Sequence, residues 1–144
     1  MAKREKRGKS KSSAGYNQKM GEDFLLQNAR KEGVIETESG LQYKIVEEIS
    51  DVRPDLHNCV VIHQRALLLN GTILEDTYRK NKPDEVNVNE LIEGLQEGIR
   101  LMGKGSRYQF WVPSDLGWGR KGTSNKIPPF AVLSFDIRLV DILN

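Results

Sequence analysis

The chain of 144 residues has room for one domain with a hydrophobic core, and its 38% apolar content suffices for folding without disulfide bonds. Its single cysteine, Cys59, excludes an internal disulfide, and no apolar run has the length of a membrane span or the placement of a signal peptide. We therefore expect a cytoplasmic protein without membrane contact.

Charge is concentrated at the start of the chain. Residues 1–11 carry six basic side chains against Glu5, a net +5, so the rest of the chain sums to −3. A segment dominated by Lys, Arg, Gly and Ser cannot offset its own ordering entropy, so we predict disorder from Met1 to about Gly15. Such a tail either contacts phosphates of nucleic acid or the ribosome, or only improves solubility. The basic residues are Lys3, Arg4, Lys6, Arg7, Lys9 and Lys11.

The first predicted elements are one short helix and a hairpin. Apolar residues recur at near-helical spacing over Gln18–Glu32, and Gly33 is a natural helix stop. Apolar and polar residues alternate over Leu41–Glu47, which indicates a half-buried strand. A longer strand is expected over Asn58–Leu69, followed by a hairpin turn at Asn70-Gly71.

The second half of the chain predicts one helix and two strands. The helix is expected over Asn87–Met102, where apolar residues form one stripe and where Asn87 and Glu90 have capping-box spacing. Alternation predicts strands over 107–112 and 133–140. A strand-rich chain with one central helix indicates an α+β architecture in which an antiparallel sheet wraps that helix.

Two patterns suggest chemistry that their context does not support. Gly117, Gly119 and Gly122 spell GxGxxG, but Pro128-Pro129 soon follows and forbids the helix whose N-terminus would meet a pyrophosphate. The second pattern, at residues 57–63, holds two histidines and the cysteine, without the second pair that zinc spacing requires. We expect neither a dinucleotide nor a metal.

The segment Gly103–Ile142 joins an alternating strand, a glycine-rich aromatic loop, a double proline and a second alternating strand. In that order it resembles the C-terminal half of the FKBP-type peptidyl-prolyl cis-trans isomerases. Residues Gly21–Glu48 are similar to the linker and first strand of the bacterial macrophage-infectivity-potentiator branch of that family.

The resemblance implies an FKBP-like half-barrel, an antiparallel sheet wrapped around one central helix, with a short N-terminal helix. It divides the chain into a disordered basic tail (1–16), a short helix with a linker (17–40) and an FKBP-like domain (41–144). Relatives in this branch dimerise through a longer upstream helical region, which the basic tail replaces here. We therefore expect a monomer.

The activity implied by the resemblance is isomerisation of X-Pro bonds in proline-containing polypeptides, which assists their folding. Uncatalysed, this reaction faces a barrier of about 18 to 20 kcal/mol, and its catalysis needs no cofactor, metal or nucleophile. It needs an apolar cavity that strips water from the amide and donors that favour the twisted imide. The resemblance assigns catalytic roles to Ile92, through its backbone N–H, to Trp118, which stands where the family usually has a Tyr, and to Glu75, a polar rim group that replaces the usual Asp. It assigns substrate-binding roles to Leu91, Ile127 and Phe135.

Other positions in the expected pocket depart from the family pattern. Leu95 replaces the usual Trp of the floor, Leu74 replaces a Phe, and Gln64 replaces a Tyr, while Asp84 stands where a Phe is common. Shorter and polar side chains give up contact area with a prolyl ring. We predict a weakened isomerase with altered or lost macrolide affinity. The alternative is a noncatalytic FKBP-like chaperone or docking module, which the basic tail localises to ribosome or nucleic acid.

Overall fold

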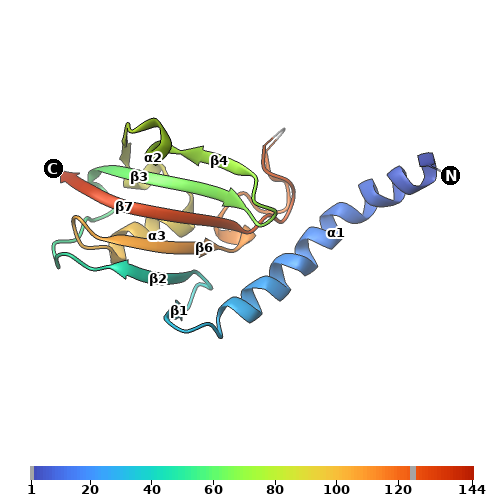
Figure 1. Ribbon diagram of the computed structural model, residues 1–144, viewed down its shortest axis with the longest axis horizontal. Helices are drawn as coiled ribbons and strands as arrows, with labels where there is room; N and C mark the ends of the chain where they lie inside the picture. The colour runs from blue at the N-terminus through green and yellow to red at the C-terminus, as the bar shows by residue number, and fades with distance from the viewer. Residues whose placement is uncertain (1, 124–125) are drawn as a thin grey trace.

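The computed structural model describes the backbone of residues 2–123 and 126–144, and the side chains from residue 14 onward within them. Within these residues, seven strands form one antiparallel sheet that bends around a single central helix, α3, which lies behind the sheet in Figure 1. The strands are β1 (Val34–Glu36), β2 (Gln42–Glu47), β3 (Cys59–Leu68), β4 (Ile73–Asp76), β5 (Asp84–Asn87), β6 (Arg107–Val112) and β7 (Leu133–Leu143). The helices are α1 (Ala2–Asn28), α2 (Thr77–Lys80) and α3 (Glu93–Leu101), with short 3-10 turns η1 (Val88–Glu90) and η2 (Ser114–Leu116).

Long strands β3 and β7 form the centre of the sheet. The strand order is β1-β2-β6-β7-β3-β4, and β5 also pairs with β3. β3 and β7 pair along their whole lengths, from Cys59 opposite Leu143 to Leu68 opposite Leu133. On its other edge, β3 pairs first with β5 and then with β4. The predicted α+β architecture is confirmed.

The core lies between α3 and the concave face of the sheet. Leu95 and Ile99 of α3 pack into the same buried cluster as Phe110 and Ile137 of the sheet. Gly98 brings the helix close to β6, since a Cβ on this glycine would lie only 2.5 Å from Cε1 of Phe110. The close approach explains why a glycine stands in the interior of a helix that it would otherwise weaken.

The central helix is shorter than the sequence predicts. It begins after Ile92 rather than at Asn87, because Asn87 is extended and pairs with Cys59 in the sheet. The expected capping box is wrong: Asn87 Nδ2 donates to Glu90 Oε1 at 2.5 Å, and the Asn87 side chain caps no backbone N–H. Pairing with β3 therefore takes precedence over the local helix signal.

The N-terminal helix is longer than predicted. α1 begins at Ala2, where the sequence predicts a disordered tail, and it ends at Asn28. Lys, Arg and Ala favour helix, and continuing an existing helix avoids the cost of nucleation, which offsets the penalty of Gly8 and Gly15 in the segment predicted to be disordered. Figure 1 shows the first half of α1 extending away from the sheet. None of the described helices is long and apolar enough to cross a membrane.

The second half of α1 is fastened to the domain. Asn17 Nδ2 donates to the carbonyl oxygen of Pro129 at 3.2 Å. A Cβ on Gly21 would lie 2.8 Å from Cγ2 of Val132, so only a glycine allows this approach to the residues before β7. In the predicted linker, β1 pairs with β2 as an edge strand. The division of the chain at residues 16 and 40 stays a prediction.

Candidate active site

The turn before α3 presents a backbone donor. Ile92 caps the helix in an extended conformation, with φ −60° and ψ 154°. Its carbonyl oxygen accepts hydrogen bonds from the N–H groups of Leu95 and Gln96, each at 3.0 Å. No hydrogen bond among the described residues uses the Ile92 N–H. The side chains of Leu91 and Ile92 pack partly buried against the core, so the donor stands at the edge of an apolar surface.

The aromatic loop passes beside this donor. A Cβ on Gly117 would lie 3.8 Å from Cδ1 of Ile92, which places the start of the loop against that side chain. Trp118 follows at once and is 46% exposed. Its indole N–H can only donate a hydrogen bond. The structure thus brings two of the predicted catalytic residues to neighbouring segments.

Backbone hydrogen bonds hold the loop that carries Trp118. The Gly119 N–H donates to the Ser114 carbonyl at 2.7 Å, and the Gly119 carbonyl accepts from the Phe130 N–H at 3.0 Å. Nearer its tip, the Thr123 N–H donates to the Ile127 carbonyl at 2.8 Å. Between Gly117 and Gly122 the chain forms turns rather than the beginning of a helix, so the geometry of a dinucleotide-binding motif is not formed.

The predicted apolar wall residues share one buried cluster. Leu95 is 3% exposed, Phe135 6% and Ile127 9%, and Leu74 packs against the same cluster from β4. Phe135 lies on β7 opposite Ala66 of β3, the strand that leads into the Asn70-Gly71 hairpin. The site assignment of these residues stays a prediction, since core packing also buries side chains to this degree.

A polar pair occupies the same side of the sheet. Gln64 stands opposite Ile137, and Asp84 stands opposite Ile62, and both of these isoleucines are fully buried against α3. Gln64 Nε2 donates to Asp84 Oδ2 at 3.1 Å. The polar side chain thereby gains the partner that its partial burial requires. Two positions that the sequence singled out separately are joined by one hydrogen bond.

Glu75 forms an ion pair with Lys80, a residue that the sequence analysis did not single out. Lys80 Nζ donates to Glu75 Oε1 at 2.8 Å, and the Asp76 N–H donates to the same oxygen at 3.1 Å. The hydrogen bond from Lys80, followed by that from Asp76, lowers the pKa of Glu75 below its ordinary value. Lys80 is the last residue of α2, which directly follows β4 and ends at Asn81 in a left-handed conformation, with φ 52°. No spacing rule in the sequence reveals such a contact.

Two pockets lie away from the predicted site residues. One of about 300 Å³ lies between α1 and the segment before β7, and its lining includes Tyr16, Met20 and Phe130. Another of about 560 Å³ opens over β3 and β7, where Arg107 binds Asp136 through two hydrogen bonds of 2.8 and 2.7 Å. Within the described part of the chain, no three His, Cys, Asp or Glu side chains group as metal ligands would.

Comparison with known families agrees with this architecture. The family model described as FKBP-type peptidyl-prolyl cis-trans isomerase matches residues 51–140, and the domain amino-terminal to FKBP-type isomerases matches residues 1–45. The chain is 38% identical over 136 residues to the FKBP-type peptidyl-prolyl cis-trans isomerase FkpA of Aeromonas hydrophila, covering 94% of this chain and 50% of that protein. It is 32% identical to the outer membrane protein MIP of Legionella longbeachae, covering 92% and 60%.

The fold also matches a solved structure. The crystal structure of FkpA from Escherichia coli superimposes with a TM-score of 0.88 at 27% sequence identity, covering 95% of this chain and 64% of that one. This match confirms the FKBP-like fold. The chain spans about half to two thirds of the length of the relatives named here. On the family match over most of its length, the chain belongs to the FKBP-type peptidyl-prolyl cis-trans isomerases.

Proposed function

We propose that this chain isomerises X-Pro bonds in polypeptides, at the surface formed by the turn before α3 and the Trp118 loop. The observation that carries the proposal is the Ile92 N–H, which stands beside an apolar wall and uses no hydrogen-bond acceptor among the described residues. The proposed role of this chain in protein folding follows from that reaction, since X-Pro isomerisation takes tens of seconds or more when uncatalysed.

The arrangement suits a reaction that needs no covalent step. During rotation the amide loses its resonance, and an apolar wall favours this state because it holds the prolyl ring away from water. The Ile92 N–H and the Trp118 indole N–H would then donate to substrate carbonyl oxygens, which positions the twisted imide. No cofactor is required by this mechanism.

The efficiency is proposed to be reduced. Leu95 and Leu74 offer less surface than aromatic side chains, which bury about 150 to 250 Å² each. The Gln64 amide is already committed to Asp84, so a polar pair occupies the wall where a prolyl ring would need apolar contact. The same loss of aromatic surface is proposed to make macrolide binding weak or absent.

The test is protease-free cis-to-trans isomerisation of a Leu-Pro peptide by the purified chain. We expect acceleration that Trp118→Ala removes, while the control Trp111→Ala keeps it, because Trp111 lies on the opposite face of β6 from the buried Phe110 and Val112. Acceleration that persists in Trp118→Ala, with the fold intact by circular dichroism, would remove the Trp118 side chain from the mechanism.

A noncatalytic chaperone or docking module is the second candidate. The hydrogen bond between Gln64 and Asp84 favours it, because a polar wall suits a peptide held by hydrogen bonds better than a prolyl ring. A folded chain without any acceleration, which still slows aggregation of an unfolded client, would support this candidate over the isomerase.

The basic start of the chain is proposed to contact nucleic acid or the ribosome. The structure describes the backbone of this segment as part of α1 but not its side chains, so the proposal rests on their charge in the sequence. The basic residues are Lys3, Arg4, Lys6, Arg7, Lys9 and Lys11. RNA binding should weaken steeply with salt and disappear on removal of residues 1–15. Binding that is insensitive to salt, or unchanged by truncation, would end this proposal.

Two further proposals concern assembly and location. We propose a monomer, which sedimentation of the purified chain would test against a dimer. Residence in the cytoplasm remains our proposal for location, and cell fractionation of the full-length natural protein would test it.

A further inference from the structure

The Thr77 side chain is fully buried although it lies in α2, a helix of four residues. Its Oγ1 lies 2.7 Å from the backbone nitrogen of Gln64, 2.9 Å from Nδ1 of His63 and 3.3 Å from the Gln64 carbonyl oxygen. Three polar atoms from two successive residues of β3 therefore converge on one hydroxyl group.

Neither of the two short neighbouring strands, β4 and β5, pairs with His63 or Gln64 of β3. β5 pairs with β3 from Cys59 to Ile62, and β4 pairs with it from Arg65 to Leu67. His63 and Gln64 lie in the gap between the two pairings, so the Gln64 N–H has no strand to donate to on that edge. The Thr77 hydroxyl accepts this N–H and thus replaces a missing bond of the sheet.

The hydroxyl can satisfy its neighbours in either form of the His63 ring. It holds one hydrogen and two lone pairs, and the Gln64 N–H occupies one lone pair. If His63 carries a hydrogen on Nδ1, the ring donates to Thr77, and the hydroxyl donates to the Gln64 carbonyl. If Nδ1 carries none, the hydroxyl donates to it.

Both ends of the candidate site depend on this point of attachment. Leu74 and Glu75 lie on β4 just before Thr77, and Asp84 lies at the start of β5 just after α2. The Gln64 side chain reaches Asp84 on the far side of the gap, at 3.1 Å. The His63-Gln64 pair is therefore bonded to the segment 73–87 at two places.

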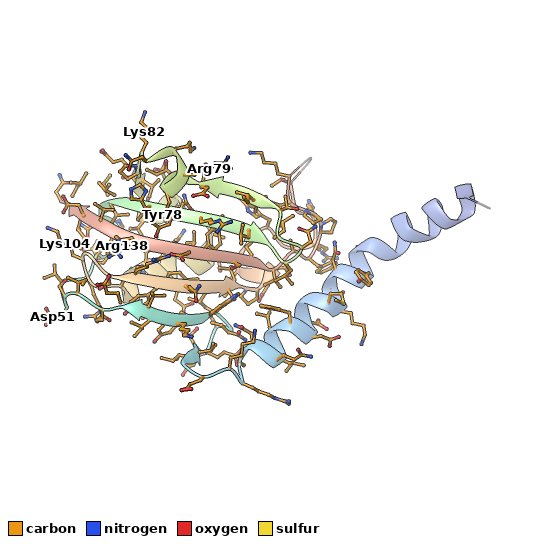
Figure 2. The ribbon with its side chains drawn as sticks, viewed as in Figure 1. Asp51, Tyr78, Arg79, Lys82, Lys104 and Arg138 are labelled. Atoms are coloured by element: carbon orange, nitrogen blue, oxygen red, sulfur yellow. The ribbon has the colours of Figure 1, made fainter. Side chains whose placement is uncertain are left out.

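The same segment also contacts the outer face of the sheet, the face away from α3, through Tyr78. The Tyr78 ring stacks on His63 at a centroid distance of 5.0 Å, and its hydroxyl donates to Asp136 Oδ1 of β7 at 3.2 Å. Figure 2 shows Tyr78 on the near face of the sheet, opposite the side on which α3 lies. Tyr78 thus holds α2 over the outer face of β3, while the Thr77 hydroxyl holds α2 close to the edge of β3.

We propose that Thr77 is a positioning residue for the isomerase site. Its hydroxyl sets the distance between β3 and the segment 73–87, and thereby the placement of Leu74, Glu75 and the Gln64–Asp84 pair on the wall that a prolyl ring would contact. This inference rests on the proposed isomerase function.

The test compares Thr77→Val, which keeps the shape and removes the hydroxyl, with Thr77→Ser, which keeps the hydroxyl. We expect kcat/KM for a Leu-Pro peptide to fall about 10-fold in Thr77→Val, chiefly through KM, because misplaced contacts weaken substrate binding. Thr77→Ser should retain the activity of the unaltered chain. The matched control is Tyr108→Phe, which removes another buried hydroxyl, one that bonds Glu48 and the Leu101 carbonyl away from the segment 73–87.

Each result decides a different point. No turnover by the unaltered chain would overturn the proposed function and this role with it. Turnover that Thr77→Val leaves unchanged would overturn the positioning role alone, as would equal losses in Thr77→Val and Thr77→Ser or an equal loss in Tyr108→Phe. Hydrogen exchange of the unaltered chain provides a test that needs no variant. The backbone N–H of Gln64 should be protected from exchange, and it should become exposed in the same opening event as α2. A backbone N–H of Gln64 that exchanges as fast as one in an exposed loop would also overturn the role.

Discussion

Asn28 Nδ2 donates to Gln42 Oε1 over 2.8 Å, and both side chains are buried, at 1% and 0% exposure. Gln42 Nε2 donates in turn to the Leu25 carbonyl at 2.8 Å and to Glu36 Oε2 at 3.0 Å. The side-chain amide of Gln42 on β2 is therefore bonded both to the last turn of α1 and to β1. These bonds fix the direction in which α1 leaves the domain.

Replacing Asn28 by Ala should loosen that junction. The change leaves Gln42 Oε1 buried without a donor, which we expect to cost about 1 to 3 kcal/mol in the free energy of unfolding. Urea unfolding would measure the loss, and hydrogen exchange in α1 would locate it. Gln27→Ala alters an exposed amide on the same helix and serves as the control. Equal stability of the two variants would contradict a supporting role for the buried amide pair.

Acid should remove stability that depends on Glu48. Burial alone would raise the pKa of Glu48, but hydrogen bonds from Tyr108 and Ser106 and the charge of Arg53 lower it, and the net result is a pKa below the ordinary value. A carboxyl whose pKa is lower in the folded state stabilises the fold above its unfolded pKa. This contribution is lost as the pH falls through the folded pKa.

The measurement is the free energy of unfolding between pH 7 and pH 3, for the unaltered chain and for Glu48→Gln. We expect the unaltered chain to lose more stability on acidification than the variant, whose side chain does not ionise. Parallel pH profiles would show that Glu48 contributes nothing to the acid response.

The sequence predicted the long strands well and the short ones poorly. A longer strand was expected over 58–69, ending at the Asn70-Gly71 turn, and β3 spans Cys59–Leu68. β1 and β5 were missed because strands of three and four residues are too short to show a period. The buried amides of Asn28 and Gln42 were also missed, since pattern reasoning assigns polar side chains to the surface.

The candidate site shows a similar division. The resemblance singled out Gln64 and Asp84 one at a time, and the structure adds the bond between them. Thr77 and Lys80 were missed, although both bond to predicted site residues. Thr77 bonds to β3 in the gap between β4 and β5, and Lys80 bonds back to Glu75 from the helix that directly follows β4. Neither feature leaves a local signal in the sequence.

Leu95→Trp should raise proline turnover, because it restores an aromatic floor where the family commonly has one. Leu95 is 3% exposed, so the larger ring must displace its neighbours, and we expect about 1 to 3 kcal/mol lower stability. Turnover of a Leu-Pro peptide would be compared with that of Leu101→Trp, at the far end of α3. No gain in a folded Leu95→Trp variant would indicate that Gln64 and Asp84 have altered the wall beyond repair by one residue.

Gly122→Ala should abolish turnover by displacing the Trp118 loop. Gly122 has φ +62°, and a Cβ there would lie 2.1 Å from the Ile127 carbonyl oxygen, which already accepts the Thr123 N–H. Gly119→Ala is the matched control, since Gly119 has a similar φ of +65° but a Cβ there would meet nothing within 4 Å. Both variants carry the strain of a left-handed alanine, about 1 to 2 kcal/mol, and only Gly122→Ala adds a collision with the backbone.

The measurement uses a Trp111→Phe background, in which Trp118 is the one remaining tryptophan. The tryptophan emission should shift more in Gly122→Ala than in Gly119→Ala, and kcat/KM should fall more in the same variant. Equal behaviour of the two variants would mean that the loop tolerates the collision, and that the turn at Gly122 does not determine the position of Trp118.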